Sequence, residues 1–214
     1  MSERGKRVAE ILLDIGAVFL RPEEPFTWAS GIKSPIYCDN RLLLSYVDER
    51  REVQDFLAEM VKEKFPNCEA VMGTSTAGIP HAAFLAERLN LPMGYVRASA
   101  KDHGRNKQIE GKVAAKQKVV VVEDLISTGS SVLEVVRILK EAGAEVLAVV
   151  SIFTYGMEKA KKAFDSEDVR LESLSNFDLA LDVAVKKAYI KESDRQALLK
   201  FRENPSDESW IELR

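Results

Sequence analysis

Apolar side chains in the first third of the chain recur with the period of an α-helix in two places. Residues 2–16 predict one helix, which Gly16 is expected to end. Its apolar face consists of Val8, Ile11, Leu12 and Ile15. A second helix is expected after Asp48, a candidate capping residue, and its apolar face consists of Val53, Phe56, Leu57, Met60, Val61 and Phe65. Residues 19–46 lack a long period and hold prolines, glycines and aromatic residues, which predicts a small lobe or flap.

From residue 69 onward, short apolar runs alternate with amphipathic segments. The expected strands cover residues 69–73, 93–97, 119–122 and 145–153, and the expected helices cover residues 80–89 and 131–142. Residues 119–122 are four consecutive valines, which favour a strand buried on both faces. Alternation of strands and helices at this spacing predicts an α/β fold, with a doubly wound parallel sheet flanked by helices.

The chain is long enough to bury one good core, so we expect a single domain over residues 1–214. Within it, we expect a hood or flap over about 17–47, a core over about 48–174 and C-terminal helices over about 176–203.

Composition excludes several classes of protein. The net charge is -3 and the pI about 5.6, so nothing global indicates a nucleic-acid or membrane partner. No apolar run approaches the roughly 20 residues of a membrane span, and residues 1–17 lack a signal-peptide core. Two cysteines and two histidines lie scattered, without the spacing of a zinc site, and we expect His81 to be structural or at the surface. These features predict a cytoplasmic enzyme or binding protein with reduced thiols.

The most specific chemical pattern follows the four valines. Glu123 and Asp124 come directly after them and lead into residues 125–131, a loop of small and hydroxyl residues before a helix. Backbone N–H groups of such a loop, together with the helix N-terminus, bind anions. Paired carboxylates suit hydroxyl groups or a divalent metal, because they repel a phosphate. The pattern therefore predicts a ligand that carries a phosphate at one end and a diol, free or metal-bound, beside it.

Two further loops follow predicted strands, and ligands of open parallel sheets bind beyond those strand ends. Residues 73–78 are small and hydroxyl-bearing, which suits an anion but also an ordinary strand-to-helix turn. Residues 97–111 form a long polar stretch that is either a solvated surface loop or a functional lid. Its basic residues are Arg97, Lys101, His103, Arg105 and Lys107. Because it leaves a strand end beside two candidate anion sites, we favour a lid that stabilises a leaving polyphosphate.

These segments together carry a family resemblance. Residues 119–131 closely resemble the phosphoribosyl pyrophosphate (PRPP) motif of the type I phosphoribosyltransferases. Residues 26–39, residues 73–80, and Arg97 with residues 101–104 resemble the orotate-specific branch of that family, in matching order along the chain. The resemblance implies transfer of a 5-phosphoribosyl group from PRPP to N1 of orotate, with orotidine 5'-monophosphate and pyrophosphate as products.

The resemblance also assigns roles to residues. Glu123 and Asp124 would hold the ribose hydroxyls, and residues 127–131 would surround the 5-phosphate. The expected PRPP-binding residues are Thr76, Ala77, Arg97, Lys101, His103, Glu123, Asp124, Leu125, Ile126, Ser127, Thr128, Gly129, Ser130 and Ser131. The expected orotate-binding residues are Lys33, Tyr37, Cys38 and Ser127, and the expected catalytic residues are Lys101, His103 and Asp124. Mg²⁺ would be held through PRPP without a direct protein ligand. The family also implies a homodimer in which the mobile loop reaches the neighbouring active site.

This chain departs from some family members in four places. Ala29, Ala77 and Ala98 stand where some members carry lysine, and the segment around Tyr155 lacks an arginine that binds orotate in some members. Lys33 and backbone N–H groups of the flap are the candidates to replace the lost cations.

Two alternatives remain open at this point. A related enzyme that acts on a purine base would share the PRPP motif, and only the flap and the lid argue against it. A regulator that senses PRPP and binds nucleic acid would need a basic face, which the net charge of -3 does not favour.

Overall fold

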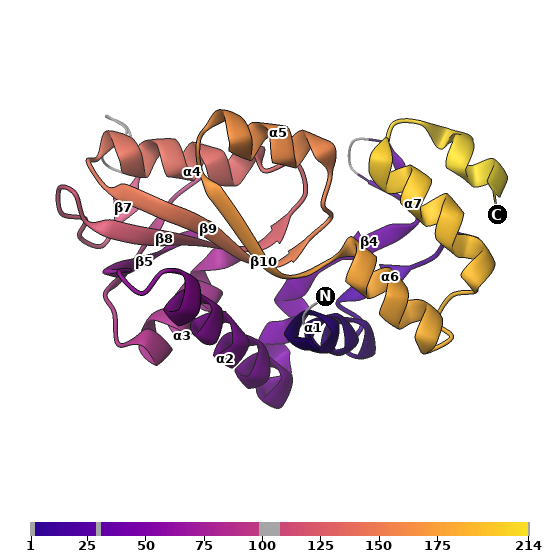
Figure 1. Ribbon diagram of the computed structural model, residues 1–214, viewed down its shortest axis with the longest axis horizontal. Helices are drawn as coiled ribbons and strands as arrows, with labels where there is room; N and C mark the ends of the chain where they lie inside the picture. Colours follow the sequence, from indigo (N-terminus) through magenta and orange to yellow (C-terminus); the bar gives the residue numbers. More distant parts are fainter. Residues whose placement is uncertain (1–2, 29–30, 99–107, 214) are drawn as a thin grey trace.

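The computed structural model describes residues 3–28, 31–98 and 108–213, and its centre is a six-stranded sheet (Figure 1). The strand order is β10-β9-β8-β5-β6-β7. The strands are β5 (Ala70–Thr74), β6 (Met93–Val96), β7 (Ile109–Glu110), β8 (Lys118–Ile126), β9 (Glu145–Thr154) and β10 (Arg170–Asn176). All neighbours run parallel except β7, which pairs antiparallel with β6. The predicted α/β class and doubly wound sheet are confirmed, with one antiparallel edge strand that the sequence pattern did not indicate.

Helices cover both faces of this sheet (Figure 1). Helices α2 (Val47–Lys64) and α3 (Gly78–Leu89) lie on one face, and α4 (Ser130–Glu141) and α5 (Glu158–Ser166) lie on the other. The four valines of β8 are fully buried and divide between the two faces. Val120 and Val122 join the core under α2 and α3, whereas Val119 and Val121 join the core under α4 and α5. The prediction of a strand covered on both faces is therefore confirmed.

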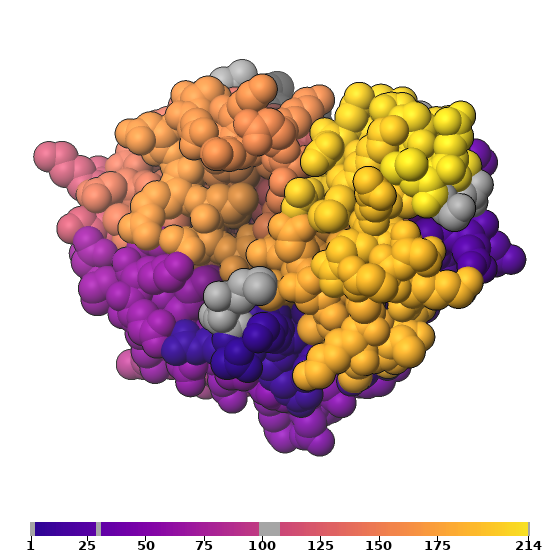
Figure 2. Space-filling view, turned by 45° about the vertical axis from the view of Figure 1, so that its right-hand side comes forward, coloured from indigo at the N-terminus to yellow at the C-terminus, as the bar shows by residue number. Residues whose placement is uncertain are grey.

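The hood is built from two short antiparallel strand pairs in the first forty residues and a following 3₁₀ turn. Strand β1 (Val18–Leu20) pairs with β4 (Ile36–Cys38), β2 (Phe26–Thr27) pairs with β3 (Lys33–Ser34), and η1 spans Asn40–Ser45. The C-terminal elements are α6 (Phe177–Lys186), η3 (Glu192–Asp194), α7 (Arg195–Glu203) and η4 (Glu208–Leu213). Figure 1 places α6 and α7 beside β4, and Figure 2 shows the yellow C-terminal residues adjoining the violet hood. The division into hood, core and C-terminal helices stays a prediction.

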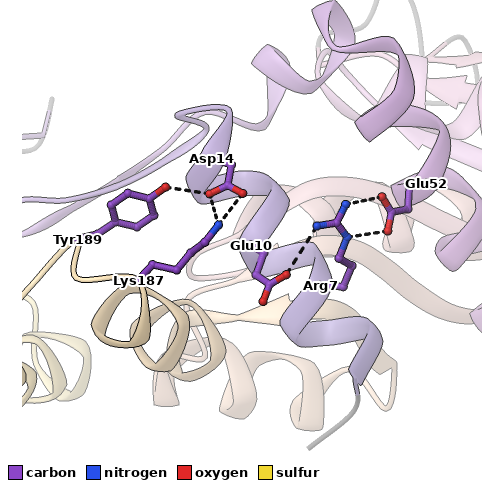
Figure 3. Close-up of polar contacts among 6 residues, drawn as sticks. All are labelled: Arg7, Glu10, Asp14, Glu52, Lys187 and Tyr189. Atoms are coloured by element: carbon purple, nitrogen blue, oxygen red, sulfur yellow. Dashed lines mark hydrogen bonds and ion pairs between the residues drawn. The ribbon is translucent and has the colours of Figure 1, made fainter.

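Helix α1 (Glu3–Asp14) connects the sheet to α6 (Figure 3). At one end, the guanidinium of Arg7 donates to Glu52 of α2 at 2.7 and 2.9 Å. At the other end, Asp14 accepts hydrogen bonds from Lys187 at 2.6 Å and from the Tyr189 hydroxyl at 2.8 Å. These groups lie at the surface, so each pair contributes at most about 1 kcal/mol. The buried apolar face of α1 therefore holds it in place, and the polar contacts orient it.

Several expected boundaries differ from those observed. Helix α2 begins at Val47, so Asp48 lies in its first turn and the prediction that Asp48 caps the helix is wrong. Strand β8 continues beyond the valines to Ile126 because its pairing with β9 continues to that residue, which places Glu123 and Asp124 inside the strand. Helix α5 and strand β10 were not expected. Only Ala160 and Phe164 of α5 are buried, and β10 is an edge strand with mostly polar residues, so neither has a strong apolar pattern.

Within the described residues, no helix combines the length and the apolar character needed to cross a lipid bilayer.

One buried polar pair predicts how stability depends on pH. His81 of α3 lies fully buried against Gln54 of α2, with Nδ1 2.8 Å from the Gln54 amide nitrogen. Burial, helped by the charge of Arg50, lowers the pKa of His81 from 6.5 to about 4. The unfolded chain therefore binds a proton between these two pH values and the folded chain does not. The free energy of unfolding should then fall as the pH falls from about 6.5 to about 4.

We expect His81→Gln to remove this dependence. Between pH 7 and pH 5 the wild-type protein should lose about 2 kcal/mol more stability than the variant, from the shift in the pKa of His81. Urea unfolding at both pH values measures the difference. Equal losses in the two proteins would show that His81 is not held neutral by burial.

Candidate active site

The two acids of β8 lie side by side at the carboxyl end of the central strand. Both are only partly exposed, and the Asp124 N–H donates to the Glu123 carboxylate at 3.0 Å. Burial, together with the neighbouring Asp124 carboxylate, raises the pKa of Glu123 to about 8. Burial also raises the pKa of Asp124. The pair is therefore short of hydrogen-bond donors and positive charge, which a sugar diol or a substrate-bound cation would supply.

The loop after β5 lies next to the acids because β5 and β8 are neighbours in the sheet. Thr74 donates its hydroxyl to the Val122 carbonyl at 3.1 Å, and Ser75 donates to the Val96 carbonyl at 2.7 Å. The loop is thus fixed to the ends of both β8 and β6. Thr76 is exposed and Ala77 half-buried, and the Ser75–Thr76 peptide bond is cis. Both predicted residues of this loop therefore lie at the same sheet edge as the acidic pair.

Gly78 begins α3 where helix and sheet are in very close contact. A Cβ at this position would overlap the Thr74 hydroxyl and the backbone carbonyl of Val122. The carbonyl belongs to the central strand and cannot move aside. A Gly78→Ala substitution must therefore push α3 away from β8.

We expect Gly78→Ala to lower the free energy of unfolding by about 3 kcal/mol, in the range of overpacked cores. Gly143→Ala is the matched control: its Cβ would lie 3.7 Å from Ala115, and only its φ of +92° is unfavourable. The control should cost about 1 kcal/mol. Urea unfolding of both variants tests this, and equal losses would contradict the steric explanation.

The loop after β8 leads into the N-terminus of α4. Gly129 is the residue before that helix and adopts φ +79°, and a side chain there would meet the Phe164 ring at 2.7 Å. Ser127 and Thr128 are half-buried, whereas Ser130 and Ser131 are exposed in the first turn of α4. The Thr128 and Ser130 hydroxyl oxygens lie 3.3 Å apart. Hydroxyl groups around free helix N–H groups suit a phosphate, as the sequence predicts.

Arg97 follows β6 at the third strand end. Its backbone N–H donates to the Gln108 carbonyl at 2.9 Å, and the Gln108 side chain donates back to the Arg97 carbonyl at 3.2 Å. The Arg97 guanidinium lies 3.7 Å from Glu110. These contacts hold the two ends of the long loop together beyond the end of β6. Lys101 and His103 lie outside the described residues, so their roles stay predictions.

The hood reaches the acids through a residue that sequence reasoning missed. Asn40 is fully buried, and its amide donates to the backbone carbonyl of Asp124 at 2.7 Å. The Cys38 thiol donates to the Asn40 side-chain oxygen at 3.3 Å. Burial raises the pKa of Cys38, so the thiol remains protonated and unsuited to nucleophilic attack. The only signal that could have indicated Asn40 was its place as a polar residue directly after residues 26–39, the segment that resembles the family.

The other predicted orotate-binding residues lie on the hood. Tyr37 is 40% exposed, with its ring 5.5 Å from that of Phe26. Lys33 is exposed and donates to Thr27 within its own hairpin at 2.9 Å. The structure therefore brings the acids and the phosphate-loop residues together at one sheet edge, and it places Lys33 on the hairpin surface. The binding roles of all these residues stay predictions.

Comparison with known proteins agrees with this architecture. The family model of the phosphoribosyl transferase domain matches residues 45–191. An orotate phosphoribosyltransferase of Bacillus cereus (strain G9842) is 53% identical over 206 residues, covering 96% of this chain and 98% of the relative. The orotate phosphoribosyltransferase of Listeria innocua is 54% identical over 205 residues, covering 96% and 97%. The crystal structure of the orotate phosphoribosyltransferase from Aeropyrum pernix superposes with a TM-score of 0.74 at 33% identity, covering 86% of this chain and 99% of that one. The chain therefore belongs to the orotate phosphoribosyltransferase family, within the type I phosphoribosyltransferases.

Proposed function

We propose that the protein transfers the 5-phosphoribosyl group of PRPP to N1 of orotate, a step of pyrimidine biosynthesis that releases pyrophosphate. Relatives of more than 50% identity over nearly the whole chain carry this activity in their names. The observation that carries the proposal within the structure is the partly buried acidic pair between the loop after β5 and the loop after β8. A diol between two phosphate-binding ends is the shape of PRPP, and the hood above it supplies a place for the base.

The chemistry needs positioning and charge stabilisation more than proton transfer. The sugar passes through an oxocarbenium-like state while pyrophosphate departs, so groups that stabilise separated charge accelerate the step. Glu123 and Asp124 hold the ribose hydroxyls, and Asp124 stabilises positive charge on the ring. The α4 N-terminus with Ser127 and Thr128 holds the 5-phosphate. Arg97 and Lys101 stabilise the leaving pyrophosphate, and His103 donates a hydrogen bond or proton to it.

Mg²⁺ is the proposed cofactor, held through PRPP. The described residues contain no group of three or more Asp, Glu, His or Cys side chains placed to bind a metal. Mg²⁺ commonly uses few protein ligands and takes most of its oxygens from phosphates and water. The raised pKa values of Glu123 and Asp124 fit a site that accepts a cation arriving on the substrate. When bound, the ion neutralises charge on the pyrophosphate.

A homodimer is part of the same proposal. Large apolar side chains that remain exposed in the described ranges concentrate in the hood and the start of α2, as at Phe19, Tyr37, Leu42, Tyr46 and Val47. Exposed apolar residues concentrated in one region are typical of surfaces that pair with another protein. A cytoplasmic location remains the expectation from the sequence.

Base specificity separates this proposal from a purine enzyme. The purified protein is incubated with PRPP, Mg²⁺ and, in separate reactions, orotate, adenine, hypoxanthine and uracil, and the ultraviolet absorbance is followed. We expect conversion of orotate alone. Conversion of a purine base in place of orotate would overturn the assignment of the acceptor.

A further inference from the structure

Tyr155 lies where the sheet meets the hood. It follows β9 directly, and its backbone N–H donates to the Ile126 carbonyl at 3.0 Å, one residue before the phosphate loop. The side chain is only 4% exposed. Burial keeps the pKa of Tyr155 well above its ordinary value, so the hydroxyl stays neutral. A buried neutral ring makes no ionic contact with a ligand, so its role lies in packing.

The Tyr155 ring belongs to a continuous column of five aromatic side chains. Its ring is stacked on Trp28 of the hood with centroids 5.9 Å apart, and it meets the edge of Phe153 at 6.0 Å. Trp28 in turn meets Phe201 of α7 at 5.7 Å, and Phe201 meets Trp210 of η4 at 5.7 Å. The column therefore runs from the central sheet through the hood to the C-terminal turn, which Figures 1 and 2 place beside the hood. Because aromatic rings prefer particular pair geometries, each pair favours one arrangement of the two segments it joins, in addition to burying apolar surface.

The hydroxyl end of Tyr155 lies beside the hood. The backbone of Cys38, the last residue of β4, is close enough to act on the pKa of this hydroxyl. The Cys38 side chain is bonded to Asn40, which donates to the Asp124 carbonyl. The end of β4 thus lies beside the Tyr155 side chain and is tied through Asn40 to the acidic pair. This stretch of hood includes residues 37 and 38, to which the family resemblance gives a role in binding orotate.

We propose that Tyr155 is a positioning residue for the acceptor base, fixing the hood over the acidic pair through the stack of its ring on Trp28. This inference rests on the proposed function and deepens it. The aromatic column extends the support to α7 and η4, so the C-terminal turn also contributes to the acceptor site.

Steady-state kinetics test the proposal. Tyr155→Leu removes the ring and with it the stack on Trp28, so we expect the KM for orotate to rise about five- to tenfold, the value of one aromatic pair. The KM for PRPP and kcat should stay within about twofold. Tyr155→Phe keeps the ring and its stack and should stay close to wild type. Tyr189→Phe is the matched control, because it deletes a hydroxyl bonded at 2.8 Å to Asp14 outside the column, and it should behave as wild type.

A spectroscopic readout tests the hood without turnover. Trp28 and Trp210 are the only tryptophans of the chain, so Trp210→Phe leaves Trp28 as the single reporter. In that background we expect Tyr155→Leu to make Trp28 emission more accessible to acrylamide, and Tyr189→Phe to leave it unchanged. Unchanged quenching together with an unchanged KM for orotate would overturn the positioning role. A rise in the KM for PRPP and a fall in kcat as large as the rise in the KM for orotate would overturn it too. A protein that never uses orotate refutes the proposed function, whereas the quenching result still decides whether Tyr155 fixes the hood.

Discussion

Replacing Asp124 by asparagine should lower kcat by about 10²–10³-fold, the loss found when one preorganised charge-stabilising group is removed from an active site. Asparagine keeps the size of the side chain and leaves the backbone carbonyl that Asn40 binds. Only the negative charge that we propose to lie beside the ribose ring disappears, so the expected loss belongs to the transition state. The measurement is the initial rate of orotate consumption at saturating PRPP.

The same substitution should make the protein slightly more stable. Asp124 and Glu123 are partly buried like charges, and both have raised pKa values. Removing one charge relieves their repulsion, which should raise the melting temperature at pH 8 by a few degrees. Asp165→Asn on the exposed side of α5 is the matched control and should change neither quantity. A fall in both activity and melting temperature in Asp124→Asn would mean that the acid supports the fold and not the reaction.

Lys101→Ala should lower kcat by roughly a hundredfold or more, because a cation that stabilises departing pyrophosphate acts mainly in the transition state. The assignment comes from the sequence, since this residue lies outside the described ranges. The KM for PRPP should change much less than kcat if the contact forms only as the loop closes. Turnover at the wild-type rate would show that the loop is not the lid.

Mixing the two inactive variants tests the dimer and the origin of the loop together. Asp124→Asn and Lys101→Ala are refolded together so that hybrid dimers form. If the loop reaches the neighbouring site, each hybrid holds one site with both wild-type groups, and about a quarter of wild-type activity should return. If the loop serves its own subunit, no site is intact and no activity returns. A monomer in solution would give the same silent result and is distinguished by its molecular mass.

Local patterns in the sequence were sufficient to predict the strand of four valines, the α3 and α4 helices and the three polar loops that follow β5, β6 and β8. They were insufficient where pairing with a distant strand determines the secondary structure. Glu123 and Asp124 are residue types common in loops, yet they belong to strand β8 because the pairing of β8 with β9 continues past them. Strand β10 has no apolar alternation because it is an edge.

The contacts that build the hood could not be predicted from local sequence patterns either, because they join residues far apart in the chain. Asn40 and Asp124 are 84 positions apart, and Trp28 meets Tyr155 and Phe201 from distant segments. A single sequence predicts which residue types suit a ligand, but it does not place such partners against one another. The absence of an arginine near Tyr155 was visible in the sequence, whereas the packing found at that position was not.

The most direct test of the account is a product assay with wild-type protein, PRPP, Mg²⁺ and orotate. Phosphorus NMR of the reaction mixture should show PRPP replaced by equal amounts of orotidine 5'-monophosphate and pyrophosphate, while orotate absorbance falls in step. Asp124→Asn should slow both changes to the same extent. Persistence of PRPP and orotate in a mixture where the same protein converts a purine base would contradict the account.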